Sequence, residues 1–283
     1  MMKNVAIVGT GLIGGSIGLS LRRAGFVGEI VGVDVSDDEA QQALVVGAIS
    51  RIGTFDDAAA ADVVVLAVPV MGILDWMKRL APVMRPRQLV TDVGSTKLAI
   101  CESARQLFDG EGQAKFLPGH PMAGKESGGA GLAEPTLFDG TTWLFTPIAD
   151  ECDLELEWRG WVAQFGARMM DLDASRHDQI CAWVSHLPQM VATAMSAMFE
   201  DEFSAEPELA ADFRAIGGRA LREMTRLGAS PFSMWRDVAF TNTRPLAATL
   251  FAMEQRLAHL RENLKTPELR EEFLKANAFR KLR

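Results

Sequence analysis

The chain has 283 residues, which is long for a single compact core and suits two domains. Its hydrophobic content of 48% is ordinary for a folded soluble protein, and its formal charge of -8 argues against a nucleic-acid partner. No apolar run approaches the roughly 20 residues that a membrane span requires, so we expect no membrane association.

The first part of the chain alternates short β-rich runs with amphipathic segments, which is typical of a parallel sheet covered by helices. The run 63–68 is apolar at every position, as expected of a strand that is buried on both faces. We expect strands at 5–9, 30–35, 63–68, 89–93, 114–119, 143–146 and 168–173, and helices at 14–24, 71–84 and 97–108.

After residue 173 the pattern becomes helical, with apolar residues spaced three and four apart. We expect helices over 177–199, 207–227 and 234–264, and we expect Pro188 and Pro245 to kink the first and the third. The sequence therefore predicts an α/β fold: an N-terminal Rossmann-type domain with a mainly parallel sheet over 1–174, and a C-terminal all-helical domain over 175–283.

A glycine-rich motif, Gly9-Thr10-Gly11-Leu12-Ile13-Gly14, follows the first strand and opens the first helix. In this pattern the glycines permit a tight turn, close approach of a pyrophosphate and close packing of helix on strand. Asp34 follows by about 20 residues, where a carboxylate accepts hydrogen bonds from the adenosine ribose hydroxyls. No Arg or Lys follows in 35–39 to bind a 2′-phosphate, so the motif predicts NAD rather than NADP. The expected cofactor contacts are Gly9, Gly11, Leu12, Ile13, Gly14 and Asp34.

Two polar clusters follow the fourth and fifth strands, at the sheet edge where open α/β folds bind ligands. The first contains Ser95, which could act on a ligand or cap the next helix. The second contains His120, which could be functional or a satisfied loop histidine, and Glu126. A histidine suits a dehydrogenase, because removing hydride from a carbinol carbon also requires the hydroxyl proton to leave. These residues favour alcohol oxidation, with Ser95 orienting the ring and Glu126 supporting it or holding Lys125. We expect no metal.

Four motifs occur in order along the chain: Gly-His-Pro-Met-Ala-Gly at 119–124 with Glu126, Ser-His-Leu-Pro at 185–188, Thr-Arg-Leu at 225–227 and Met-Trp-Arg-Asp at 234–237. In these motifs, and over nearly its whole length, the chain resembles the prephenate and arogenate dehydrogenase family. The resemblance implies NAD-dependent oxidative decarboxylation of prephenate to 4-hydroxyphenylpyruvate in tyrosine biosynthesis, or of arogenate to tyrosine by the same chemistry.

The same resemblance implies roles for individual residues. His120 would be the base or polariser at the C4 hydroxyl of the substrate, with Ser95 beside it. Arg226 would bind a substrate carboxylate, a task suited to a bidentate guanidinium, and Arg222 is the fallback on the same helix. The other pocket residues that it implies are His186, Glu126 and Trp235. By residue type alone, His186 is typical of a core histidine and Trp235 of a core or interface residue.

The chain departs from the family pattern near the expected substrate side chain, which leaves prephenate against arogenate open. Gln189 stands where the family often has histidine, Lys125 stands where it often has threonine, and 231–233 replaces the usual Asp-Pro. Two other functions remain as alternatives. A hydroxyacid dehydrogenase would need a lysine in the first long helix, and 179–186 contains none. A non-catalytic NAD-binding sensor would have no need of Ser95, His120 and Arg226 together.

The helix expected over 234–264 carries an apolar stripe formed by Leu246, Leu250, Met253, Leu257, Leu260 and Leu264. This stripe predicts a homodimer through the helical domain, unless it packs within its own domain. The three cysteines lack metal-ligand spacing, which favours free thiols in the cytoplasm. We expect neither a signal peptide before the first strand nor a regulatory domain after the last helix, so any inhibition by tyrosine would act at the active site.

Overall fold

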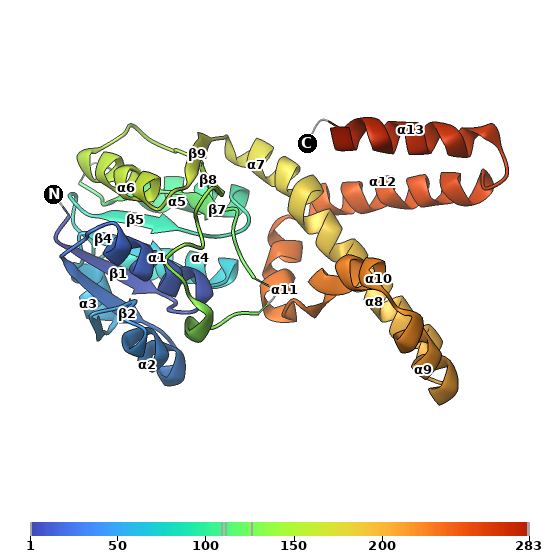
Figure 1. Cartoon of the computed structure of the whole chain (residues 1–283). Helices are drawn as coiled ribbons and strands as arrows, with labels where there is room; N and C mark the ends of the chain where they lie inside the picture. The colour runs from blue at the N-terminus through green and yellow to red at the C-terminus, as the bar shows by residue number, and fades with distance from the viewer. Residues whose placement is uncertain (1, 109, 111, 126, 282–283) are drawn as a thin grey trace.

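The computed structural model describes residues 2–108, 110, 112–125 and 127–281. A sheet covered by helices forms one end of the molecule, and a helical region projects from it (Figure 1). Within the described residues the main sheet has six strands in the order β3-β2-β1-β4-β5-β6, and every neighbouring pair is parallel. The strands are β1 Asn4–Val8, β2 Glu29–Val33, β3 Arg51–Ile52, β4 Val63–Leu66, β5 Leu89–Asp92 and β6 Lys115–Leu117.

Alternate residues of the central strand enter different cores on the two faces of the sheet. Val5 and Ile7 pack in one core, and Ala6 and Val8 pack in the other. This confirms the prediction of strands buried on both faces, because helices cover each side. The first core contains side chains from α1 (Leu12–Arg23), α2 (Asp37–Val45) and α6 (Asp153–Gln164), and the second from α3 (Phe55–Ala60), α4 (Val70–Leu80) and α5 (Leu98–Phe108).

The strand expected over 114–119 is two strands in two different sheets. β6 ends at Leu117, and β7 (Gly119–Pro121) pairs antiparallel with β8 (Thr142–Phe145), which pairs parallel with β9 (Arg168–Asp171). Pro118 stands at the break, and it has no N–H group with which to continue a ladder. The backbone N–H of Gly119 instead donates to the Asp92 carboxylate at the end of β5, at 3.2 Å. This contact places β7, and with it His120, at the carboxyl end of the main sheet.

The C-terminal region is helical, and the predicted fold class is confirmed. Its elements are α7 (Ala174–Cys181), a π-helical turn (Ala182–His186), α8 (Leu187–Phe203), α9 (Pro207–Ile216), α10 (Arg219–Thr225), a 3-10 turn (Arg226–Ala229), α11 (Phe232–Thr241), α12 (Thr243–Glu262) and α13 (Pro267–Lys281). α12 and α13 run side by side in opposite directions (Figure 1). Among the described residues, none of the helices combines the length and hydropathy of a membrane span.

Two of the expected long helices are broken, and Pro245 lies at a helix start rather than inside a helix. The helix expected over 207–227 is interrupted at Gly217 and Gly218, and the one over 234–264 at Asn242. Pro245 therefore lies in the first turn of α12, where its missing N–H group costs nothing. Pro188 is the second residue after the π-helical turn, and the wider turn relieves the clash between its ring and the preceding carbonyl groups.

Candidate active site

The loop between β1 and α1 is shaped for the close approach of a phosphate group. Gly9 has a positive φ of 88°, and a Cβ there would collide with the backbone of Ala67. A Cβ on Gly14 would meet the carbonyl oxygen of Gly9, whereas the space beside Gly11 is open. Among the described residues no side chain caps α1, and its first turn is without acidic groups, so its N-terminal N–H groups can face an anion. These features fit a dinucleotide pyrophosphate.

Asp34 follows β2 directly and lies beside the glycine motif, as the sequence predicts. Its Oδ2 accepts hydrogen bonds from the backbone nitrogen of Thr10 at 2.7 Å and from the Thr10 hydroxyl at 3.1 Å. Its Oδ1 accepts from the backbone nitrogen of Ser36 at 3.0 Å. These contacts hold the half-buried carboxylate at the edge of the phosphate loop.

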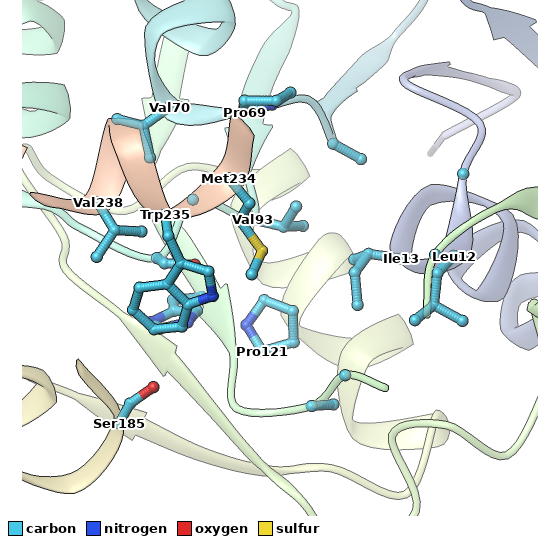
Figure 2. Close-up of a pocket in the computed structure, with 18 of the residues that line it drawn as sticks. Leu12, Ile13, Pro69, Val70, Val93, Pro121, Ser185, Met234, Trp235 and Val238 are labelled. Carbon is cyan, nitrogen blue, oxygen red and sulfur yellow. The ribbon is translucent and has the colours of Figure 1, made fainter. Parts of the chain in front are cut away.

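A cavity of about 520 Å³ lies between the carboxyl edge of the sheet and the helical region. Figure 2 shows Met234 and Trp235 of α11 on this cavity with Pro121, and Ile13 and Leu12 of α1 on its other side. The cavity brings together seven of the predicted site residues: Gly11, Leu12, Ile13, Ser95, His120, His186 and Trp235.

A second cavity of about 340 Å³ shares a wall with the first. Both are lined by Gly124, Lys125, Val184, Ser185, Met234 and Trp235. Arg226 lines only the second, together with Gln189 and Ser230, and the alternative arginine, Arg222, lines neither. The predicted pocket residue Glu126 lies outside the described residues. The nearby Lys125 ammonium donates to the carbonyl oxygen of Leu132 at 2.9 Å and pairs with Glu134 at 3.2 Å.

His120 stands at one end of a buried chain of hydrogen-bonded polar groups. Its Nδ1 lies 2.9 Å from Nε2 of His177, and Nδ1 of His177 lies 2.8 Å from Oδ1 of Asp178. His120 is 7% exposed and His177 is fully buried. Burial lowers the pKa of His120 well below 6.5, and the nearby His177, Lys97 and His186 lower it further. His120 is therefore a neutral imidazole at neutral pH, which is the form that can accept a proton.

Two aspartates of the helical region cap helices of the sheet region. Asp178 accepts hydrogen bonds from the backbone nitrogens of Lys97 at 2.7 Å and Leu98 at 3.0 Å, at the start of α5. Asp237 accepts from the backbone nitrogen of Met71 at 3.1 Å, at the start of α4. A carboxylate at a helix N-terminus satisfies orphan N–H groups and complements the helix dipole. Asp178 therefore provides the cap for which Ser95 was one candidate, and Ser95 lies on the cavity wall.

His186 comes from the π-helical turn, whose residues 184–186 all face the cavity. The Asn242 amide nitrogen donates to the carbonyl oxygen of Asp178 at 2.9 Å and lies 3.1 Å from Nδ1 of His186. Nδ1 is therefore the accepting nitrogen of His186, and Nε2 carries the proton. Burial lowers the pKa of His186 to about 4. Its ring meets Trp235 edge to face at 5.8 Å.

His177, Asp178 and Asn242 also belong to this site, and none of the three was predicted from the sequence. The sequence did contain a signal, since His177 is one of only four histidines in the chain and is followed directly by a carboxylate. Within the described residues, His120, His177 and Cys181 form the group whose side chains could hold a metal ion. The 2.9 Å distance between the two imidazole nitrogens is already explained by a hydrogen bond.

Comparison with known families gives matches to both regions of the chain. The family model described as "Prephenate dehydrogenase, nucleotide-binding domain" matches residues 17–170, and the one described as "Prephenate dehydrogenase, dimerization domain" matches residues 173–277. A prephenate dehydrogenase of Lactococcus lactis is 33% identical over 264 residues, which are 92% of this chain and 70% of that protein.

Solved structures show the same relationship. A prephenate dehydrogenase from A. aeolicus, crystallised with hydroxyphenyl propionate and NAD+, superposes with a TM-score of 0.86 at 28% identity, covering 100% of this chain and 98% of the other. A Synechocystis arogenate dehydrogenase superposes with a TM-score of 0.77 at 29% identity, covering 98% and 99%.

Proposed function

The chain belongs to the prephenate dehydrogenase family, and from that premise we propose that it uses NAD to oxidise and decarboxylate prephenate to 4-hydroxyphenylpyruvate. This reaction is a step of tyrosine biosynthesis. The observation that carries the proposal is the pair of joined cavities, of which one runs from the glycine motif to His120 and the other reaches Arg226. A dinucleotide in the first and a dicarboxylate reaching into the second would meet beside His120.

When bound, NAD accepts the hydride that leaves C4 of the substrate ring. His120 takes the proton of the C4 hydroxyl, so that the carbinol carbon becomes a ketone carbon. The ring carboxylate then leaves as CO2 and the ring becomes aromatic. The phenolate oxygen takes the proton back from His120, which closes the proton balance. The lowered pKa of His120 suits this role because the ring is unprotonated before the reaction.

The remaining predicted residues would hold the substrate. Arg226 would pair with a carboxylate, and Trp235 would pack against the ring. His186 would donate from Nε2, which makes no hydrogen bond among the described residues, although the backbone of Ser95 lies close enough to favour its charged form. Holding the substrate against the cofactor is the main requirement of the second step, because aromatisation drives loss of the carboxylate. Ser95 and Glu126 would complete the pocket.

A second candidate function is the conversion of arogenate to tyrosine by the same chemistry. The similarity to the arogenate dehydrogenase of Synechocystis over 98% of this chain favours it. Gln189, which lines the second cavity, donates to the carbonyl oxygen of Leu227 at 2.7 Å and accepts from the Ser230 hydroxyl at 3.1 Å. This amide would face the side chain that distinguishes the two substrates.

We assign NAD rather than NADP as the cofactor. The carboxylate of Asp34, held beside Thr10, would accept hydrogen bonds from the ribose hydroxyls and repel a 2′-phosphate. The segment that follows, Val35-Ser36-Asp37-Asp38-Glu39, adds three acidic residues and contains no cation.

A homodimer through the helical region is part of the proposal. Of the predicted apolar stripe, Leu246 of α12 is buried, but Leu257 of α12 and Leu264, just beyond its end, are 57% and 63% exposed. On α13, Phe273 and Phe279 are 63% and 60% exposed. Apolar surface on this scale is typical of an interface, and light scattering should give twice the chain mass. All three cysteines are free thiols, which fits a cytoplasmic enzyme.

The test is an absorbance assay for NADH formation, in which the purified protein and NAD are offered prephenate or arogenate in separate reactions. We expect turnover of prephenate, with arogenate as the competing result that would reassign the substrate. Turnover of neither, with NAD binding confirmed by a thermal shift, would overturn both and favour a hydroxyacid dehydrogenase or a non-catalytic NAD-binding sensor. The same assay with NADP measures the expected cofactor preference.

A further inference from the structure

The buried chain from His120 to Asp178 has only one consistent arrangement of protons. Asp178 accepts two backbone N–H groups, as a carboxylate does, so its Oδ1 also accepts from Nδ1 of His177. A neutral His177 that carries its proton on Nδ1 has a lone pair on Nε2. Nδ1 of His120 must then carry a proton and donate it to His177 at 2.9 Å.

The consequence concerns the other nitrogen of His120. With Nδ1 protonated, the neutral ring has its lone pair on Nε2, which is the nitrogen not engaged by His177. His120 lines the larger cavity, so this lone pair is the one available to a substrate hydroxyl. The opposite tautomer would present an N–H group there and could not act as a base.

We propose that His177 and Asp178 are positioning residues that hold His120 as the Nδ1–H tautomer, with Nε2 as the proton acceptor. This inference rests on the proposed function, because it assumes that His120 is the base. Asp178 also stabilises the imidazolium that forms when His120 takes the substrate proton, since a carboxylate two hydrogen bonds away offsets part of the buried charge. The roles require both regions of the molecule, because His120 lies on β7 and its partners lie on α7.

Several other charged or titratable groups face the hydrogen-bonded series His120–His177–Asp178. Lys97 is fully buried, and its ammonium is held at 2.5 Å by Asp92 of β5. His186 approaches from the π-helical turn. Cys181 of α7 places its sulfur 3.6 Å from Nε2 of His177, and burial raises the pKa of this thiol to about 12. A neutral thiol is a weak donor, so the shorter contact from His120 dominates at that nitrogen.

Histidine 15N chemical shifts test the proton arrangement directly in the full-length, NAD-loaded enzyme. The protein has only four histidines, so three variants, His177→Gln, His186→Gln and His259→Gln, assign all four sets of signals, that of His120 by elimination. We expect a protonated Nδ1 on His120 and His177 and a protonated Nε2 on His186, which serves as an internal contrast. A protonated Nε2 on neutral His120 would overturn the inference.

Kinetics provide the second test. His177→Leu removes the acceptor, and we expect kcat to fall by roughly 10- to 1,000-fold with little change in KM or NAD affinity. His177→Gln keeps an accepting oxygen and should recover at least a tenth of the wild-type rate. Cys181→Ala is the matched control, because it removes the other contact to the same nitrogen and should change kcat by less than about twofold.

Two outcomes of these kinetics would overturn the inference: wild-type kcat and pH profile in His177→Leu, or equal loss in the Leu, Gln and Cys181→Ala variants. Failure of the proposed function has a different signature. Wild-type protein would then turn over neither substrate, while the 15N shifts could still show the expected tautomers.

Discussion

In the sheet region apolar side chains fill two closed cores, whereas in the helical region many apolar side chains are exposed and several buried groups are polar. Ile7 of β1 and Val65 of β4 are fully buried, but Phe232 and Phe240 of α11 are 78% and 73% exposed. The buried groups of the helical region include His177, Asp178, His186, Asp237 and Asn242.

This difference shows that the two regions contribute different parts of the candidate site. The sheet region packs around itself and leaves a cradle for the cofactor at its carboxyl edge. The helical region directs its buried polar groups at that same edge, where they cap α4 and α5 and contact His120. Buried polar groups require partners, and these partners lie across the boundary between the regions. The candidate site therefore exists only where the two regions meet.

The largest expected effect comes from removing the proton acceptor that the sheet region supplies. His120→Asn should lower kcat by roughly 10²- to 10⁴-fold, because the proton acceptor is lost. NAD affinity should stay near the wild-type value, since the glycine motif is untouched. Steady-state kinetics and a fluorescence titration with NADH measure the two quantities. A near-normal kcat would remove His120 from the mechanism.

The next largest effect comes from removing the arginine with which the helical region would bind the substrate. Arg226→Ala should raise KM by the equivalent of about 2–4 kcal/mol, roughly 30- to 1,000-fold, through loss of a charge-assisted contact. Arg222→Ala is the matched control, since Arg222 is near in sequence but lines neither cavity. The assignment fails if the two variants exchange phenotypes.

The third effect is the dependence of stability on pH that a buried histidine of the helical region causes. Burial lowers the pKa of His186 to about 4, below its ordinary 6.5, so the unfolded chain takes up this proton first as the pH falls. The free energy of unfolding should therefore decline from about pH 6.5 towards pH 4, by about 3 kcal/mol from this residue. In His186→Gln the decline over that window should be smaller by this amount. Urea unfolding at a series of pH values measures it, and equal declines in both proteins would contradict the prediction.

The smallest effect should stay inside the sheet region. Asp34→Ala should weaken NAD binding by roughly tenfold and reduce the preference for NAD over NADP, because the ribose acceptor is lost. Dissociation constants for both cofactors give the result directly. Unchanged binding of NAD would refute the ribose assignment.

The parts of the fold that could be predicted are those that depend on residues close together in the sequence. The apolar run at 63–68 and the motif at 9–14 depend on neighbours along the chain, so the parallel sheet and its phosphate loop follow from sequence alone. The division of 114–119 into two strands does not, because it depends on Pro118 together with Asp92, which is distant in sequence. The kink expected at Pro245 was wrong because the predicted helix is interrupted at Asn242, so that Pro245 lies in the first turn of α12.

The candidate site divides in the same way. His120 and Arg226 stand in motifs that can be recognised, whereas the pairing of His120 with His177 spans 57 positions and requires the helical region to be docked. The partners predicted for His120 were Ser95 and Glu126, because they stand in the polar clusters that follow the fourth and fifth strands. Tertiary contacts between buried polar groups leave no periodic signal in sequence, which is why His177 and Asp178 were missed.

The carboxylates that cap α4 and α5 also limit how the enzyme can move. A hinge motion that separated the two regions would remove Asp178 and Asp237 from the helix ends that they cap. Each lost cap would cost about 1–2 kcal/mol. The hydroxyl contact between Thr96 and Thr241, at 2.7 Å, would break in the same motion. These contacts therefore favour the arrangement in which the catalytic geometry is assembled, and any opened arrangement of the two regions is a minor state.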